Sequence, residues 1–244
     1  CVAGINITAS HNPKEYNGYK AYWEDGAQLP PEHADTVSAE IDKLDIFRDV
    51  KQIPLAKALE SGTVRMIGAE IDEKYLENVQ AQAVNPQAIA AVADTLSIVY
   101  TPLHGTGHKL VPEIIRRAGL KHLYTVDEQM VIDGSFPTVK KPNPEYPDVF
   151  ALGIALADRV GSDLIVATDP DADRVGIAVK NGDDFTLMTG NDVGALLLNY
   201  ILECRTANGT LPNNPVAVKT IVTTELCQKI ADAYGCELIN VLTG

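Results

Sequence analysis

The sequence predicts an α/β fold: successive α/β domains with mixed, largely parallel sheets covered by helices. Two observations indicate this fold. Short apolar runs, rich in Val and Ile, alternate along the chain with longer segments in which apolar residues recur every three or four positions. Most connections between these segments are short, as expected where strands and helices follow one another in β-α-β order.

The N-terminal segments predict one strand and two helices. Residues 2–8 form an apolar run that ends at a turn. Helical spacing of apolar residues covers residues 31–44 and 69–83. Asn85-Pro86 is expected to end the second helix, because proline has no N–H to continue the helical hydrogen bonds. Residues 45–68 are mixed, and we expect a domain edge there.

From residue 97 onward, strands and helices alternate regularly. The expected strands cover residues 97–101, 123–126, 163–167, 175–179, 216–222 and 237–241. The expected helices cover residues 149–160, 192–203 and 224–234, together with a segment that follows the glycines of 105–107 and ends at Gly119. The four prolines between residues 133 and 147 predict an irregular loop.

Composition limits the classes of partner. The formal net charge of −13 and a pI near 4.7 argue against nucleic acid or an anionic membrane as the main partner. No apolar run approaches the roughly 18 residues of a membrane span, and no signal peptide is visible. The four cysteines lack metal-ligand spacing, so free thiols in a reducing cytoplasm are expected. An anionic substrate would need local cations, for which the candidates are Lys14, Lys20, Lys109, Arg174 and Lys219.

The strongest functional signal is the run Asp169-Pro-Asp171-Ala-Asp173-Arg174 between two apolar strands. On an extended or looped backbone, alternate side chains project to the same side. Three converging carboxylates repel one another unless a cation lies among them, and oxygen-only ligands favour Mg²⁺. Arg174 adds a bidentate donor for phosphate oxygens. A solvated acidic turn is the simpler alternative. A strand ending in Asp-x-Asp also opens the pattern of haloacid-dehalogenase-type phosphatases, which use an aspartate nucleophile.

A second signal is Ser10, which the segment Thr8–Pro13 places on a sharp bend. Asn12-Pro13 prevents helical continuation there. A serine hydroxyl is a poor nucleophile and needs a neighbouring base or a metal. Residues 16–20 then supply a second turn and a return strand that carries Lys20. The alternative is an ordinary turn with a serine in an N-cap-like position.

His104 lies in the run Thr101–Gly107, at the junction between an expected strand and an expected helix. The exposed amides of a helix N-terminus would suit an anion there. A glycine-rich structural turn with a hydrogen-bonded histidine is the alternative, and the sequence leaves both open.

Three motifs, in this order, resemble the α-D-phosphohexomutase superfamily of phosphoglucomutases, phosphomannomutases and related phosphopentomutases. They are Thr8–Pro13 with Asn17–Lys20, then Thr101–Gly107, and finally Asp169–Arg174. They occur in the family's order between residues 8 and 174, which makes the resemblance specific. Residues 14–20 and the run from Gly26 to Pro31 look most like bacterial phosphoglucomutases.

The resemblance implies a four-domain enzyme of which this chain is a piece. Residues 1–68 would be the C-terminal part of domain I with the phosphoserine loop, residues 69–188 domain II with the metal-binding loop, and residues 189–244 the N-terminal part of domain III. The missing initiator Met and the strand-like runs at both ends agree with this expectation. The sugar-discriminating loop and the phosphate-clamping domain IV would lie outside the chain, so we expect negligible mutase turnover from the chain alone.

The resemblance further implies how a metal would be held. Ser10 would be the serine that is phosphorylated in the resting enzyme. Asp169, Asp171 and Asp173 would bind Mg²⁺, and the phosphoserine at Ser10 would supply a fourth oxygen.

The remaining implied roles concern the phosphoryl group and protons. Arg174 would contact the phosphoryl group, Lys20 would act as general acid/base, and His11 would lie beside the phosphoserine. The implied reaction interconverts hexose 1-phosphate and hexose 6-phosphate through a bisphosphorylated sugar, with glucose as the expected sugar. Mannose or pentose phosphates are the alternatives. We therefore expect a cytoplasmic enzyme that acts on a small sugar phosphate, with neither nucleic acid nor a membrane as its partner.

Overall fold

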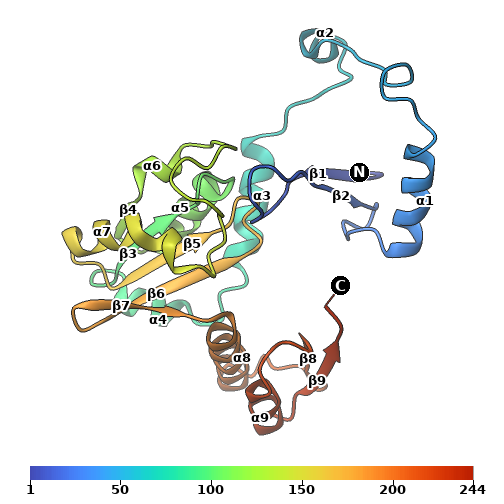
Figure 1. The fold of residues 1–244 in the computed structure, drawn as a ribbon. Coiled ribbons are helices and arrows are strands. Elements are labelled where there is room, and N and C mark those ends of the chain that lie inside the picture. Colours follow the sequence, from blue (N-terminus) through green and yellow to red (C-terminus); the bar gives the residue numbers. More distant parts are fainter. Residues whose placement is uncertain (244) are drawn as a thin grey trace. The chain divides into compact units, whose positions relative to one another are not determined.

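A computed structural model describes residues 1–243 and divides into two compact units (Figure 1). The small unit consists of Cys1–Ser10 and Lys14–Tyr75, and the large unit consists of His11–Pro13 and Leu76–Gly244. Elements are mixed α and β in both units, as the sequence predicts. Among residues 1–243, no helix has the length and apolar content to cross a membrane.

The small unit contains one strand pair and its helices. Strands β1 (Gly4–Ile7) and β2 (Tyr19–Tyr22) pair antiparallel, which confirms the strand expected within residues 2–8. Helix α1 (Pro31–Ile41) ends three residues before the predicted end. Helix α2 (Leu55–Glu60) lies in the segment left unassigned, because its six residues are too few to show a helical period. Helix α3 (Ala69–Gln80) crosses the boundary between the units.

A five-stranded mixed sheet forms the centre of the large unit, in the order β4-β3-β5-β6-β7. Its strands are β3 (Ser97–Thr101), β4 (His122–Thr125), β5 (Leu164–Thr168), β6 (Val175–Asn181) and β7 (Asp184–Met188). The pairs β3-β4 and β3-β5 are parallel, whereas β5-β6 and β6-β7 are antiparallel. The prediction lacks β7, which follows β6 through a hairpin turn at Gly182 (φ 64°).

The core of the large unit lies around strand β3, whose five residues are all buried. Val99, Ile165 and Phe150 are at most 1% exposed and belong to one apolar cluster. Burying a side chain such as that of Phe150 contributes about 2 kcal/mol. Helix α7 (Ala151–Val160) packs on this sheet at Gly153, where an added Cβ would lie 3.0 Å from Cγ2 of Ile165. The other helices before residue 160 are α4 (Pro86–Val92), α5 (Gly107–Arg117), α6 (Asp127–Met130) and the 3₁₀ turn η1 (Pro147–Phe150).

The last segment of the large unit contains two helices and a parallel strand pair. Its elements are α8 (Gly190–Ala207), β8 (Val216–Thr220), α9 (Leu226–Ala233) and β9 (Glu237–Val241). Helix α8 begins at a capping box, in which Thr189 and Asp192 each satisfy the other's backbone N–H. Leu202, Ala231 and Cys236 form a second apolar cluster here. All four cysteines are free thiols, as expected.

One boundary prediction is wrong. Asn85-Pro86 does not end the preceding helix, which already ends at Gln80, but begins helix α4. The Asn85 Oδ1 atom accepts a hydrogen bond of 3.0 Å from the Ala88 backbone N–H. Pro86 occupies the first helical turn, where its missing N–H costs nothing. The same two residues can stop one helix or start another, and here they start one.

Candidate active site at the aspartate loop

Residues 169–174 form a loop that reverses the chain between β5 and β6. The two strands pair antiparallel up to Thr168 and Val175, so the predicted interruption of one strand is the tip of a hairpin. Ala172 adopts a left-handed backbone (φ 60°), and its N–H donates to the Asp169 carbonyl oxygen (2.9 Å). The Arg174 N–H donates to Asp169 Oδ1 (3.0 Å). The first aspartate therefore fixes the last residue of its own loop.

The three aspartates of this loop lie together. Ligand oxygens of Asp169, Asp171 and Asp173 are all within 4.8 Å of one another. Asp169 is fully buried, Asp171 is half-buried and Asp173 is exposed, so the cluster opens from the sheet edge toward solvent. Such a set of carboxylate oxygens could hold a divalent metal ion, which would also relieve the mutual repulsion of the carboxylates.

His11 belongs to the same unit as this cluster. Partial burial, and then the positive charge of Arg174, lower the pKa of His11 from its ordinary value of 6.5. Glu145, Asp171 and Asp173 act on the same imidazole in the opposite direction. These influences show that His11 lies within electrostatic reach of Asp171, Asp173 and Arg174 in the aspartate loop.

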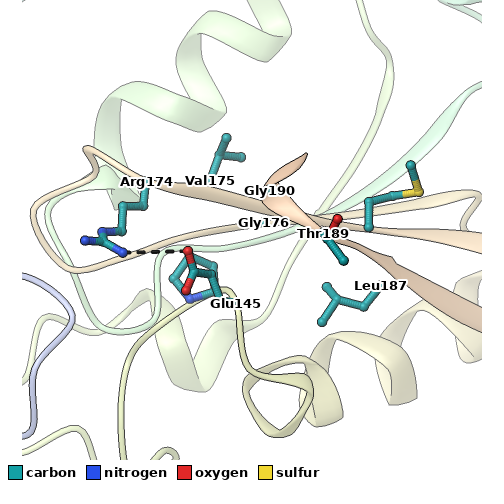
Figure 2. A pocket seen from close by; sticks show the side chains of 9 residues that line it. Glu145, Arg174, Val175, Gly176, Leu187, Thr189 and Gly190 are labelled. Atoms are coloured by element: carbon teal, nitrogen blue, oxygen red, sulfur yellow. Dashed lines mark ion pairs between the residues drawn. The ribbon is translucent and has the colours of Figure 1, made fainter. Parts of the chain in front are cut away.

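Arg174 lines a cavity of about 510 Å³ and faces Glu145 across it (Figure 2). The Arg174 Nη1 and Glu145 Oε1 atoms are 3.7 Å apart, and the two side chains are 42% and 66% exposed. An ion pair this exposed contributes little to stability, but it orients the guanidinium group. The other lining residues are Pro144, Val175, Gly176, Leu187, Met188, Thr189 and Gly190.

Glu145 was not singled out by the sequence, because its position depends on the path of an irregular loop. That loop approaches β6 at Gly176, where an added Cβ would lie 2.3 Å from the Pro144 carbonyl oxygen. A glycine inside a strand is a signal of such an approach. Gly176 indicates that another backbone segment lies close to β6. It does not indicate that this segment also brings Glu145 to the cavity.

Ser10 and Lys20 belong to the small unit. Ser10 has a left-handed backbone (φ 53°), and its N–H donates to Thr8 Oγ1 (2.8 Å). The turn is closed by a hydrogen bond from the Thr8 N–H to the Gly18 carbonyl oxygen (3.1 Å). Lys20 lies on β2 opposite Asn6. The sharp bend at Ser10 and the return strand with Lys20 are therefore confirmed, whereas a meeting of both residues with the aspartates stays a prediction.

His104 is buried, and its ring binds protein atoms at both nitrogens. Nδ1 lies 2.9 Å from the Val131 carbonyl oxygen, and Nε2 lies 2.8 Å from Thr138 Oγ1. The ring is only 2% exposed. Of the two interpretations left open by the sequence, the hydrogen-bonded structural turn is the one that this geometry favours.

Family comparisons match both units of the chain. The family model described as "Phosphoglucomutase/phosphomannomutase, alpha/beta/alpha domain I" matches residues 1–46, and that of domain II matches residues 73–182. Among curated proteins, the chain is 37% identical over 243 residues to a phosphoglucomutase of Staphylococcus saprophyticus and 36% identical over 244 residues to one of Staphylococcus epidermidis. Each match covers 99% of this chain and 43% of the relative, so the chain spans less than half of the relatives' length.

Solved structures share the fold at lower identity. A putative phosphomannomutase of Thermus thermophilus matches with a TM-score of 0.75 at 21% identity, over 100% of this chain and 49% of that one. A variant of an Aspergillus fumigatus N-acetylphosphoglucosamine mutase, solved in complex with glucose 1,6-bisphosphate, matches with a TM-score of 0.59 at 17% identity, over 99% of this chain and 56% of that one.

Proposed function

Because the chain belongs to the phosphoglucomutase/phosphomannomutase family, we propose that it carries the phosphoserine loop and the metal-binding loop of a phosphosugar mutase. The reaction is the interconversion of hexose 1-phosphate and hexose 6-phosphate. Glucose is the proposed sugar, because the curated relatives at 35–37% identity are phosphoglucomutases. Mannose and pentose phosphates are the alternatives within the same chemistry.

The observation that carries this proposal is the surroundings of His11. His11 lies within electrostatic reach of Asp171, Asp173 and Arg174, and Ser10 is joined to His11 by one peptide bond. We therefore propose that Ser10 acts in the same active site as the three aspartates.

The proposed reaction runs in two phosphoryl transfers. The P–O bond to Ser10 breaks as a new P–O bond forms to a free hydroxyl of hexose 1-phosphate, and the proton of that hydroxyl passes through Lys20 to the released Ser10 oxygen. The bisphosphorylated sugar then reorients within the site. Its other phosphoryl group returns to Ser10, and the proton of the Ser10 hydroxyl passes through Lys20 to the released sugar oxygen.

The charged residues have complementary roles in this reaction. Asp169, Asp171 and Asp173 would hold Mg²⁺, which when bound neutralises negative charge on the phosphoryl oxygens. Arg174 would donate two parallel hydrogen bonds to the same group. His11 would pack beside the phosphoserine and restrict access of water to it, since hydrolysis would discharge the phosphoserine without product.

We also propose the domain division of the longer enzyme. Residues 1–68 would end domain I, residues 69–188 would form domain II, and residues 189–244 would begin domain III. Closure around the sugar would then depend on parts outside the chain, so the chain alone would turn over glucose 1-phosphate at a negligible rate. The negative charge and free thiols of the chain fit a cytoplasmic enzyme.

Mass spectrometry tests the phosphoserine directly. The chain, after incubation with glucose 1,6-bisphosphate and Mg²⁺, should gain about 80 Da on the peptide that contains Ser10. Ser10→Ala should abolish the gain, whereas the matched variant Ser38→Ala, which changes an exposed serine on α1, should retain it.

Other outcomes of this measurement contradict the proposal. A phosphoryl group on Asp169 would favour the aspartate-nucleophile phosphatase, because that enzyme class forms an acyl phosphate. A gain that persists in Ser10→Ala would also exclude Ser10 as the phosphorylated residue. Robust isomerisation of glucose 1-phosphate by the purified chain would show that the proposed inactivity is wrong.

A further inference from the structure

The middle of the aspartate loop is fixed by a second loop that the proposed function does not use. The Thr106 backbone N–H and the Thr106 hydroxyl both donate to the Pro170 carbonyl oxygen, at 2.8 and 3.0 Å. Gly105 approaches the same residue so closely that an added Cβ would lie 2.3 Å from Pro170 Cα. Pro170 lies between Asp169 and Asp171 in the chain, so any shift of its carbonyl moves both carboxylates.

This second loop, residues 102–106, keeps an unusual backbone. Leu103 (φ 47°) and His104 (φ 66°) both adopt the left-handed conformation, which costs about 1 kcal/mol per residue without glycine. Hydrogen bonds offset that cost. The Leu103 N–H donates to Thr101 Oγ1 (3.1 Å), and the His104 N–H donates to the Gln129 carbonyl oxygen (2.9 Å). The buried Leu103 side chain, 0% exposed, anchors the loop in the core.

A chain of buried side-chain hydrogen bonds holds His104 in place. The Val131 carbonyl oxygen can only accept, so His104 Nδ1 carries the hydrogen of that bond. Nε2 of the neutral ring then accepts from the Thr138 hydroxyl. Thr138 Oγ1 in turn accepts from Gln129 Nε2 (3.0 Å), and Gln129 Oε1 accepts from the Thr101 hydroxyl (2.6 Å). Each side-chain nitrogen and oxygen named in this chain has a hydrogen-bond partner, and a buried network of this kind defines one arrangement of its members.

We propose that residues 102–106 and this hydrogen-bond network serve to position the metal-binding loop. In this inference, which rests on the proposed function, Thr106 and His104 are positioning residues: they do not touch the metal but set the spacing of the carboxylates that do. Residues that orient metal ligands in this way change metal affinity by about 10- to 100-fold when they are removed. The run Thr101–Gly107 therefore belongs to the metal site through the Pro170 carbonyl, and not as a site for an anion.

The binding of Mn²⁺ to the full chain, followed by electron paramagnetic resonance, tests this role. Thr106→Val removes the hydroxyl bond to Pro170 and retains the side-chain shape, so we expect the Kd for Mn²⁺ to rise about tenfold. Thr106→Ser keeps the hydroxyl and should restore the wild-type Kd. Thr95→Val is the matched control, because the Thr95 hydroxyl also donates to a backbone carbonyl, that of Val92, away from the aspartates.

A second variant tests the buried network. His104→Phe keeps a ring and removes both ring hydrogen bonds, and it should raise the Kd for Mn²⁺ in the same direction. Unfolding of the metal-free proteins, measured alongside, identifies any variant that is not folded at the titration temperature. If Thr106→Val and a folded His104→Phe both bind Mn²⁺ as tightly as the wild type, the positioning role is wrong while the metal site stands. If the wild type does not bind Mn²⁺, or if Asp171→Asn leaves its Mn²⁺ binding unchanged, the metal site and the positioning role are both wrong.

Discussion

At the scale of one residue, Tyr100 on β3 contacts the end of strand β5 inside the sheet, next to the aspartate loop. Its side chain is 0% exposed, and its hydroxyl lies 2.8 Å from Thr168 Oγ1, across the β3-β5 pair. Helix α5 begins directly above this contact, since a Cβ added at Gly107 would lie 2.4 Å from the Tyr100 hydroxyl. The last residue before the aspartate loop is therefore fixed by a buried phenol.

Burial raises the pKa of Tyr100 to about 12, and the hydrogen bond to Thr168 opposes this only in part. A pKa that is higher in the folded state than in the unfolded state means that the neutral phenol stabilises the fold. This contribution is fully present below pH 10 and is lost as the pH rises toward about 12. Alkaline solution should therefore destabilise the large unit partly through this residue.

Tyr100→Phe tests this expectation. At pH 7 the variant loses the hydrogen bond to Thr168, so the free energy of unfolding should fall by about 1 kcal/mol. Between pH 10 and 12 the difference between wild type and variant should shrink, because phenylalanine has no proton to lose. Urea titrations at several pH values measure both effects. A difference that stays constant up to pH 12 would show that Tyr100 does not contribute to the alkaline loss.

The sequence could reveal site residues that occur in a local pattern, but it could not reveal contacts between separate loops. Asp169, Asp171 and Asp173 are spaced so that proximity follows from the chain itself, and the structure brings them together. Glu145 and Thr106 reach the site only because separate loops pack against β6 and Pro170. No local period encodes such packing.

At the scale of elements, Asn85 begins α4 and also contacts a distant helix. Its Oδ1 caps the first turn, while Nδ2 lies 3.9 Å from the Cys204 sulfur on α8. Asn85→Ala should lower the free energy of unfolding by about 1 kcal/mol, since an N-cap oxygen is lost. Asn85→Asp keeps that oxygen and should remain close to wild type in urea unfolding. Equal losses in both variants would assign the effect to the contact with Cys204 instead.

Long periodic elements were predictable, and short ones were not. Helix α7 and strand β3 follow from apolar periodicity and from burial along a whole strand. Helices α2 and α6 have six and four residues, too few for a face to repeat. In strand β7, Phe185 and Leu187 alternate with polar residues. Strand β6, which precedes it across Gly182, is also strand-like in sequence, so the pattern is equally compatible with one longer strand.

At the scale of the whole molecule, the three clustered aspartates all come from the large unit. Its main apolar cluster draws only on residues between Val99 and Leu187. We expect residues 69–244, produced alone, to fold and to bind Mn²⁺ with a Kd close to that of the full-chain variant Ser10→Ala, which also lacks the serine oxygen. Circular dichroism and Mn²⁺ titration measure the two properties. Loss of binding in a folded 69–244 protein would show that residues 1–68 contribute a ligand other than Ser10.

The division into units could be foreseen only approximately. The mixed pattern of residues 45–68 led to an expected edge there, whereas the compact units divide inside α3, after Tyr75. A helix that continues from one unit to the next gives no break in periodicity, so its sequence contains no sign of the boundary. The proposed limits at residues 68 and 188 rest on the resemblance and stay predictions.

The shared carbonyl of Pro170 has a consequence for protein engineering. Thr106 and Pro170 are 64 positions apart in the chain, yet one oxygen atom joins them. A designer who transplants the aspartate hairpin into another scaffold would need to carry the 101–107 segment with it, together with a partner for His104. Without that segment the graft would retain its acidic side chains but not their spacing.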